Sequence, residues 1–152
     1  MIWILVLLSV FLVDLCIKKY AEANLKEEKQ LFGGKILVRL FHNDGIAMGM
    51  LSEHQEAVRK GTFGMMGGLM ICFISLLFQK GRTLRKAGLS LLLGGALCNW
   101  FDRFHQRTVT DYFSFNVRWK RLRNIVFNLS DLCIIAGLIL AMLGGRRKYR
   151  RR

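Results

Sequence analysis

The chain of 152 residues contains no proline, and its ten acidic residues are outnumbered by 24 Lys and Arg. It also has no low-complexity linker and no internal repeat, so we predict a single domain over residues 1–152. The four cysteines show no CxxC spacing and lie in apolar stretches, which favours small packing residues over disulfide or zinc ligands. They are Cys16, Cys72, Cys98 and Cys133.

Metal-binding and phosphate-binding patterns are missing as well. His42, His54 and His105 are scattered without ligand spacing, so we predict neither a metal site nor a cofactor. No Gly-Lys-Ser/Thr sequence follows a strand, which argues against a phosphate-binding loop. Glycines in the apolar stretches, such as Gly64 and Gly94, therefore predict close packing of helices.

Long hydrophobic runs are what the sequence has instead. Hydrophobic residues make up 53% of the chain, which is too apolar for an ordinary soluble domain. The runs 62–78, 87–103 and 125–143 are long enough, or nearly so, to cross a hydrocarbon core of about 30 Å. A fourth run, 1–17, lacks the basic start of a cleavable signal peptide, and we interpret it as a retained first span. The predicted fold is an all-α membrane protein with four transmembrane helices.

Basic residues flanking these runs predict the orientation. The loop after the second run and the tail 144–152 together carry ten Lys and Arg and no acidic residue. The positive-inside tendency places both termini in the cytoplasm, although the stretch from Arg103 to Arg123 on the other side is basic too. No nucleic-acid-binding motif accompanies the net charge of +14, so we expect the tail to contact anionic lipid head groups and no nucleic acid to bind.

Two extracytoplasmic segments, 18–60 and 104–124, are expected to form a small β-containing cradle. Lys35–Phe41 and Tyr112–Trp119 favour strands, and Asn43-Asp44-Gly45 supplies a turn. The charged stretch Lys19–Gln30 fits either a short surface helix or a loop.

Polar residues converge at the extracytoplasmic ends of the predicted spans. Asp131 lies inside the last run, where a charge costs about 2.5 to 3.5 kcal/mol or more and needs a partner from elsewhere. Taken singly, the others are better explained as ion pairs at helix ends, such as Asp14 with Lys18 at i,i+4, or as interhelical hydrogen bonds. Threading the spans alternately through the membrane brings four pieces of chain to one face, and they carry Asp14, Lys18, Asn43, Asn99, Asp102, Arg103, Asp111, Asn128 and Asp131.

The motifs around these residues resemble, in order, those of the lipoprotein signal peptidase family, signal peptidase II. They are DLCIKKY from Asp14, NDGIAMG from Asn43, GGALCNWFDR from Gly94, TVTDYF around Asp111 and FNLSD up to Asp131. The chain departs from the family pattern at Cys98, Arg107 and Ser130, where small residues are usual. No departure removes a carboxylate, so they bear on substrate preference and efficiency more than on reaction type.

The resemblance implies an aspartic endopeptidase of the bacterial cytoplasmic membrane, with its site at the extracytoplasmic face. Its substrate would be a prolipoprotein, cut just before a diacylglyceryl-modified cysteine. The resemblance assigns catalysis to Asp111 and Asp131, and two close carboxylates that share one proton would suit that role. Supporting or substrate-binding roles fall to Asn43, Asn99, Arg103, Asn128, Asp14 and Lys18.

The sequence leaves two other classes of function open. A small cation or proton channel or transporter would place Asp14 and Asp131 along an ion path, and it predicts ion flux and tolerance of changes at Asp111. A non-catalytic relative would bind lipopeptides without cutting them. The sequence carries no indication of the oligomeric state.

Overall fold

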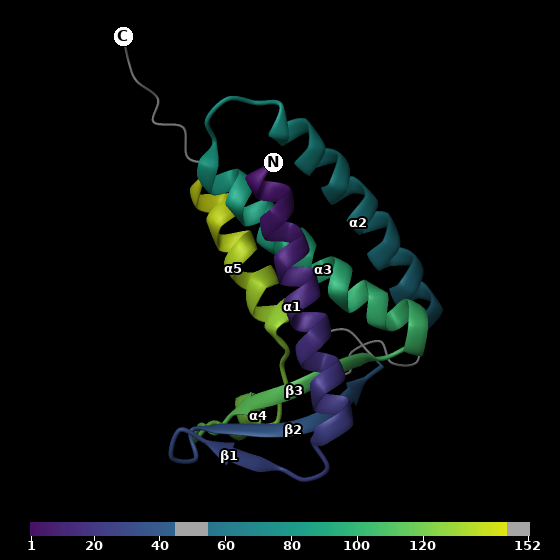
Figure 1. The fold of residues 1–152 in the computed structure, drawn as a ribbon, viewed down its shortest axis with the longest axis vertical. Coiled ribbons are helices and arrows are strands. Elements are labelled where there is room, and N and C mark those ends of the chain that lie inside the picture. Colours follow the sequence, from purple (N-terminus) through teal and green to yellow (C-terminus); the bar gives the residue numbers. More distant parts are fainter. Residues whose placement is uncertain (45–54, 146–152) are drawn as a thin grey trace.

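The computed structural model describes residues 1–44 and 55–145. This part of the chain is mostly helical, with a small antiparallel sheet at one end of the helical bundle (Figure 1). The basic residues of the tail, 146–152, lie outside the described residues, as do His54 and the NDGIAMG motif after Asp44. The helices are α1 (Ile2–Asn24), α2 (Gln55–Leu77), α3 (Thr83–Gln106), the single-turn α4 (Lys120–Arg123) and α5 (Leu129–Leu143), and the strands are β1 (Lys29–Leu31), β2 (Ile36–Asn43) and β3 (Val109–Phe115).

Helix α3 is the centre of the bundle and packs against α1, α2 and α5. Its glycines allow this close approach. A Cβ on Gly94 would lie 2.7 Å from the carbonyl oxygen of Leu7 in α1, and one on Gly95 would lie 2.5 Å from that of Ser130 in α5. The prediction of glycine-mediated packing is thus confirmed for α3. Among the described residues it is wrong for Gly64 and Gly67 of α2, because none of their atoms lies within 4 Å of a Cβ built on either glycine.

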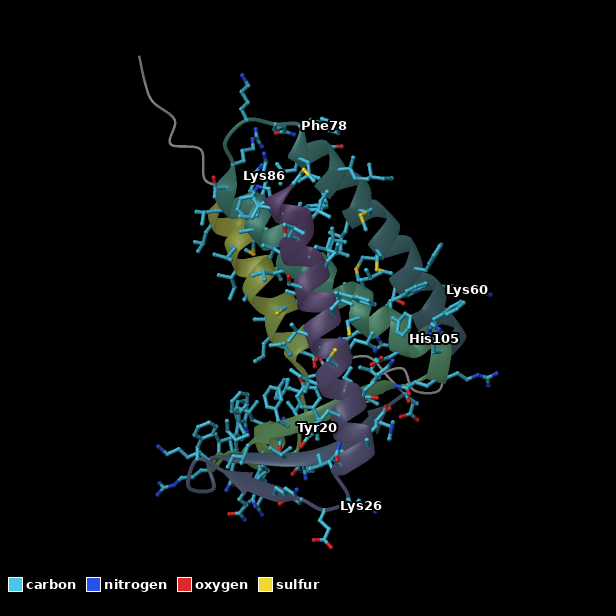
Figure 2. All side chains as sticks on the ribbon, viewed as in Figure 1. Tyr20, Lys26, Lys60, Phe78, Lys86 and His105 are labelled. Atoms are coloured by element: carbon cyan, nitrogen blue, oxygen red, sulfur yellow. The ribbon has the colours of Figure 1, made fainter. Side chains whose placement is uncertain are left out.

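The outer helix faces are apolar, whereas charged side chains are buried between the helices. Asp14 and Lys18 are 0% and 2% exposed. The side chains projecting outward from the helices are largely hydrophobic (Figure 2), and exposed examples are Ile2, Leu5, Phe63, Ile71, Ile135 and Met142. Apolar surface outside and paired charges inside are typical of a protein surrounded by lipid.

By length and composition, one helical segment among the described residues qualifies to cross a membrane, Lys60–Leu77. Helix α5 is apolar but shorter, and α1 and α3 carry charged residues within their length. Four transmembrane spans therefore stay a prediction. The observed helices overlap all four predicted runs, and α1 continues to Asn24, beyond the predicted run 1–17.

The sheet has the order β1-β2-β3 with antiparallel neighbours. Both predicted strands exist, but β2 extends two residues past Phe41, and β3 begins three residues before Tyr112 and ends at Phe115. An irregularity in the register of β2 with β3 lies between Val38 and Phe41, next to the position opposite Asp111. Asn43 in β2 and Asp111 in β3 are therefore near neighbours across the ladder.

Helix α5 begins later than the hydrophobic run suggests. The run starts at Ile125, but the helix starts at Leu129, and Phe127 forms an antiparallel bridge with Phe113 in β3. Phe127 donates its N–H to Phe113 and accepts from Tyr112 and Phe113. This short extended segment ties the start of α5 to the sheet, so β3 and α5 meet where their carboxylates lie.

Candidate active site

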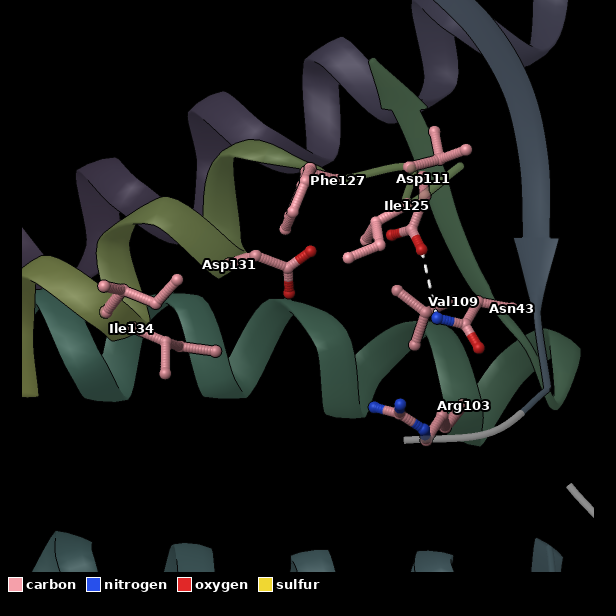
Figure 3. A pocket seen from close by; sticks show the side chains of 10 residues that line it. Asn43, Arg103, Val109, Asp111, Ile125, Phe127, Asp131 and Ile134 are labelled. Carbon is pink, nitrogen blue, oxygen red and sulfur yellow. Dashed lines mark hydrogen bonds between the residues drawn. The ribbon is translucent and has the colours of Figure 1, made fainter. Parts of the chain in front are cut away.

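A pocket of about 420 Å³ lies where α3, β3 and α5 meet. Figure 3 shows the carboxylates of Asp111 and Asp131 pointing into it, with Asn43 and Arg103 at the same polar end. The rest of the lining is apolar, and it consists of Val109, Ile125, Val126, Phe127, Ile134 and Ile135. The pocket therefore joins a pair of carboxylates to a hydrophobic wall.

Asp131 is held by the first turn of α5. Asn128 is the N-cap, and its Oδ1 accepts from the backbone N–H of Asp131 at 2.8 Å. In return, the Asp131 carboxylate accepts from the N–H of Asn128 at 3.2 Å, which completes a capping box. The positive end of the helix dipole stabilises a carboxylate at this position. The cost expected for a charge deep in an apolar helix is thus reduced, because Asp131 is at the helix start.

Asp111 projects from β3 and is only 2% exposed. Its carboxylate accepts hydrogen bonds from the side-chain amides of Asn128 (2.6 Å) and Asn43 (3.2 Å). Burial and the nearby Asp131 charge raise the pKa of Asp111 to about 7, whereas the two amides and the more distant Lys18 act to lower it. The pocket therefore contains one carboxyl group that holds its proton near neutral pH.

Asn99 and Asn128 connect the two carboxylates. Asn99 Nδ2 donates to Asp131 at 2.9 Å, and its Oδ1 accepts from Asn128 Nδ2 at 3.2 Å. Since Asn128 also donates to Asp111, each carboxylate has an amide of its own, and the two amides contact each other. The pair is fixed from the bundle side, which leaves the pocket side open to a ligand.

Lys18 is the buried cation behind this pair. Its Nζ lies 2.7 Å from Asp102, 2.8 Å from Asn99 Oδ1 and 3.3 Å from Asp14. The predicted pair of Asp14 with Lys18 is therefore present, and Lys18 also sets the orientation of the amide that holds Asp131. Asp14 and Lys18 stand one layer behind the pocket, not in its lining.

Arg103 projects from α3 into the lining of the pocket (Figure 3). Its Nη1 donates to the backbone carbonyl of Asn99 at 3.4 Å. It also lines a second, smaller cavity of about 70 Å³ between α2 and α3, with Thr62 and Trp100 among its neighbours. Asp102, the adjacent residue, turns to Lys18 and to the N–H of Thr110. Asp102 therefore belongs to the buried network of Lys18, whereas Arg103 faces the two cavities.

Three residues that were not among the predicted site residues belong to this arrangement. The Tyr112 hydroxyl donates to Asp14 at 2.9 Å and accepts from the N–H of Leu129, and burial next to Asp14 raises the pKa of Tyr112 so that it stays a donor. Ser130 donates to Asp14 through both its backbone N–H and its hydroxyl. Thr110 donates to Glu22 at 2.6 Å. Their adjacency to Asp111 and Asp131 in the sequence was the available signal.

The positions that depart from the family pattern also have structural explanations. Cys98 is fully buried, while Cys16 and Cys72 are exposed and Cys133 is half-buried, so the packing interpretation of the cysteines fits Cys98 best. Arg107 ends α3 with φ of 68°, a left-handed conformation that costs a non-glycine residue about 1 kcal/mol. Ser130 adds a hydrogen bond to Asp14.

Among residues 1–44 and 55–145, no group of three or more His, Cys, Asp or Glu side chains is arranged to hold a metal ion. His42 lies 3.9 Å from Glu22, and the ring of His105 packs on Phe101.

Comparisons with known proteins agree on one family. Residues 6–145 match the family model described as signal peptidase (SPase) II. A lipoprotein signal peptidase of Lactobacillus johnsonii is 26% identical over 93% of this chain and 90% of its own length. One of Histophilus somni is 35% identical over 64% of this chain and 60% of its own length. For relatives above 30% identity, the match spans between 48% and 60% of the relative's length.

A solved structure described as a bacterial membrane enzyme has the same fold. It superposes with a TM-score of 0.78 at 20% sequence identity, over 99% of this chain and 94% of its own.

Proposed function

The chain belongs to the signal peptidase II family, and on this premise we propose that it removes signal peptides from prolipoproteins as an aspartic endopeptidase. The cut would fall just before a diacylglyceryl-modified cysteine. The enzyme would be a single domain of the bacterial cytoplasmic membrane, with four spans, both termini in the cytoplasm and the site on the extracytoplasmic side.

The observation that carries the aspartic mechanism is the meeting of Asp111 and Asp131 in one pocket, one from β3 and one from α5. The raised pKa of Asp111 supports a state in which the pair holds one proton. The ionised carboxylate takes a proton from water, and the water attacks the scissile carbonyl. The protonated partner then donates to the leaving amine. Because such a pair titrates as a unit, the two roles belong to the pair.

The remaining polar residues have distinct roles in this proposal. Asn99 and Asn128 hold the carboxylates through direct hydrogen bonds. Arg103 and Asn43 face the pocket and bind carbonyl oxygens of the substrate. Asp14 and Lys18 position Asn99 and join α1 to α3, so they act through other residues.

The apolar wall of the pocket suits a substrate that arrives from lipid. Ile134 and Ile135 line the pocket on α5, and Ile135 is 52% exposed at the outer face of the bundle. A signal helix and acyl chains in the membrane can therefore reach the pocket without crossing water. A channel or transporter is not favoured, because Asp14 is fully buried and bonded to Lys18, Tyr112 and Ser130.

The test is cleavage of a lipidated and an unlipidated prolipoprotein by the purified protein. Asp111→Asn and Asp131→Asn each remove a general acid or base, so we expect cleavage to fall by about 10² to 10⁴-fold or more. Glu27→Gln, a matched loss of an exposed carboxylate in the turn before β1, is the control and should keep full activity. Wild-type cleavage by either Asn variant would rule out the aspartic mechanism. Equal cleavage of both substrates would rule out the lipid requirement.

A further inference from the structure

One end of the sheet carries a strongly basic surface. The segments 29–41 and 116–124 contain seven Lys and Arg and no acidic residue. They are Lys29, Lys35, Arg39, Arg118, Lys120, Arg121 and Arg123. All are exposed except Arg39, which is half-buried and lies 3.8 Å from Glu28 at the sheet edge. We call this surface the basic shelf.

Direct contacts join the two segments of the basic shelf. Asn116 donates through its backbone N–H to Lys35 and through its side chain to Gly34, at 2.8 and 2.6 Å. Arg39 in β2 donates to the backbone carbonyls of Arg123 and Asn124. The turn between β1 and β2 and the short helix α4 accordingly lie at the same end of the sheet (Figure 1). The seven charges are thus held on one folded unit.

Large apolar side chains stand among these charges. Phe32 is 75% exposed and Trp119 is 68% exposed, and Leu31 and Val117 are exposed as well. Phe32 has φ of 53°, the left-handed region that a bulky residue rarely adopts, and Gly33 and Gly34 follow with φ of 65° and 81°. This strained turn presents a phenylalanine outward, where it adds nothing to the internal core.

Exposed aromatic residues interleaved with Lys and Arg are typical of a membrane–water interface. Tryptophan rings prefer the level of the head groups, and Lys and Arg stems lie along apolar surface while their charges reach phosphate. The head-group region would cover the apolar area of Phe32 and Trp119, which water leaves exposed. The absence of acidic residues from both segments adds a net attraction for anionic lipid.

We propose that the basic shelf docks on the phosphate groups of anionic phospholipids, in the outer leaflet of the membrane that the helices span. Trp119 and Phe32 enter the head-group region, and the surrounding Lys and Arg contact phosphates. Because β3 belongs to the same sheet and is bridged to the segment before α5, docking sets the level of Asp111 relative to the membrane surface. The inference rests on the membrane placement in the proposed function, but not on peptidase chemistry.

Tryptophan quenching tests the proposal on the full chain. The protein is reconstituted in vesicles of phosphatidylcholine alone or in an equal mixture with phosphatidylglycerol, with brominated acyl chains as the quencher. The difference between wild type and Trp119→Phe isolates the signal of Trp119, because Trp3 and Trp100 are unchanged. We expect stronger quenching of Trp119 in the mixed vesicles. This gain should vanish at about 1 M salt, where the screening length is about 3 Å.

Charge variants locate the effect. Arg118→Gln with Arg121→Gln should abolish the gain in quenching that phosphatidylglycerol produces. Lys80→Gln with Arg82→Gln removes two charges from the loop between α2 and α3, at the other end of the bundle, and should preserve the gain. Equal quenching of Trp119 in both kinds of vesicle, or the same gain in the Arg118 and Arg121 variant, would overturn the proposal. A protein that shows the gain but cuts no prolipoprotein would support docking and refute the proposed function.

Discussion

The side-chain amide of Asn128 is used at both of its ends. Its oxygen caps α5 by accepting from the N–H of Asp131, and its nitrogen donates to the Asp111 carboxylate at 2.6 Å. The residue that starts the helix is thus the one that links the two catalytic candidates. Its two functions can be separated by substitution.

Asn128→Ser retains a good N-cap but is too short to reach Asp111, whereas Asn128→Ala loses both contacts. We expect cleavage to fall by about 10- to 100-fold in both variants, as for the loss of a hydrogen bond to a charged group worth about 1.5 to 3 kcal/mol. Only Asn128→Ala should also lose the cap, which contributes about 1 kcal/mol to stability. Cleavage kinetics and thermal unfolding in detergent separate the two. Full activity of Asn128→Ser would show that the bond to Asp111 is dispensable.

The raised pKa of Asp111 predicts how activity depends on pH. Because the pair must keep one proton, kcat/KM should fall about tenfold per pH unit above about pH 7. The Asn43 hydrogen bond lowers this pKa, so Asn43→Ala should move the descending limb to higher pH. A pH profile of cleavage measures both effects. A limb that stays in place or moves to lower pH in Asn43→Ala would contradict this assignment.

The same pKa has a consequence for stability. The folded state keeps the Asp111 proton from the ordinary value of about 4 up to about pH 7, a range in which the unfolded chain has lost it. The stability from this group is therefore fully present below about pH 4 and is lost as pH rises through about 7. Asp111→Asn removes this dependence. Its unfolding temperature should drop less than that of the wild type between about pH 5 and pH 8.

At the level of helices and strands, the hydrophobic pattern predicted which elements exist better than the residues at which they begin and end. The strand over Lys35–Phe41 and the helix over the first run both exist, because β-branched runs and apolar length are strong signals. Ile125–Phe127 are apolar too, and they fit a helix start or a strand equally well until Phe113 is there to pair with them. The Asn128 and Asp131 spacing is a capping signal that favours a helix start at Leu129.

The sequence identified those site residues whose charge, lying in an apolar stretch, requires a neutralising or hydrogen-bonding partner. Asp131, Asp14 and Lys18 were identifiable because charges in apolar stretches must be neutralised. Their actual partners were less accessible, since Tyr112 is 98 positions from Asp14 and the match depends on how β3 lies against α1. Glycine packing depends on neighbours in the same way, which is why similar glycines in α2 and α3 differ.

The contrast between these glycines gives a matched pair of variants. Gly95→Ala places a Cβ 2.5 Å from the Ser130 carbonyl, pushes the start of α5 away from α3, and should cost about 1 to 3 kcal/mol of stability together with activity. The Cβ of Gly67→Ala meets no atom of residues 1–44 and 55–145 within 4 Å, and alanine replaces a poor helix former, so the change should stabilise α2 by up to about 1 kcal/mol. Thermal unfolding and cleavage assays compare them. Equal behaviour of the two variants would refute this view of the helix contacts.

For the whole molecule, α1 begins and α5 ends at the end of the bundle opposite to the sheet (Figure 1). Phe78 and Lys86 mark that same end, whereas Tyr20 and Lys26 lie beside the sheet (Figure 2). The basic loop and both ends of the described bundle are thus on one side, and the carboxylate pocket is on the side of the sheet. This arrangement agrees with the charge bias on which the predicted orientation depends.

Reporter fusions test that orientation in cells. A fluorescent protein that matures only in the cytoplasm should be active when fused after Gly145 or inserted at Gly81. Alkaline phosphatase, which needs the extracytoplasmic side, should be active when inserted at Gly33 in the turn between β1 and β2. Phosphatase activity at Gly81, or its absence at Gly33, would reverse the predicted topology.

The buried network from Asp14 through Lys18 and Asn99 to Asp131 makes α1 a component of the site, although it contributes no residue to the pocket lining. Ser130 and Tyr112 close the network back onto Asp14. Substitutions at these positions are therefore epistatic, since a change in one alters the hydrogen-bonding requirement of the next. The departure from the family pattern at Ser130 lies inside this network, so its effect on the site is transmitted through Asp14 and Lys18 and not by contact with the substrate.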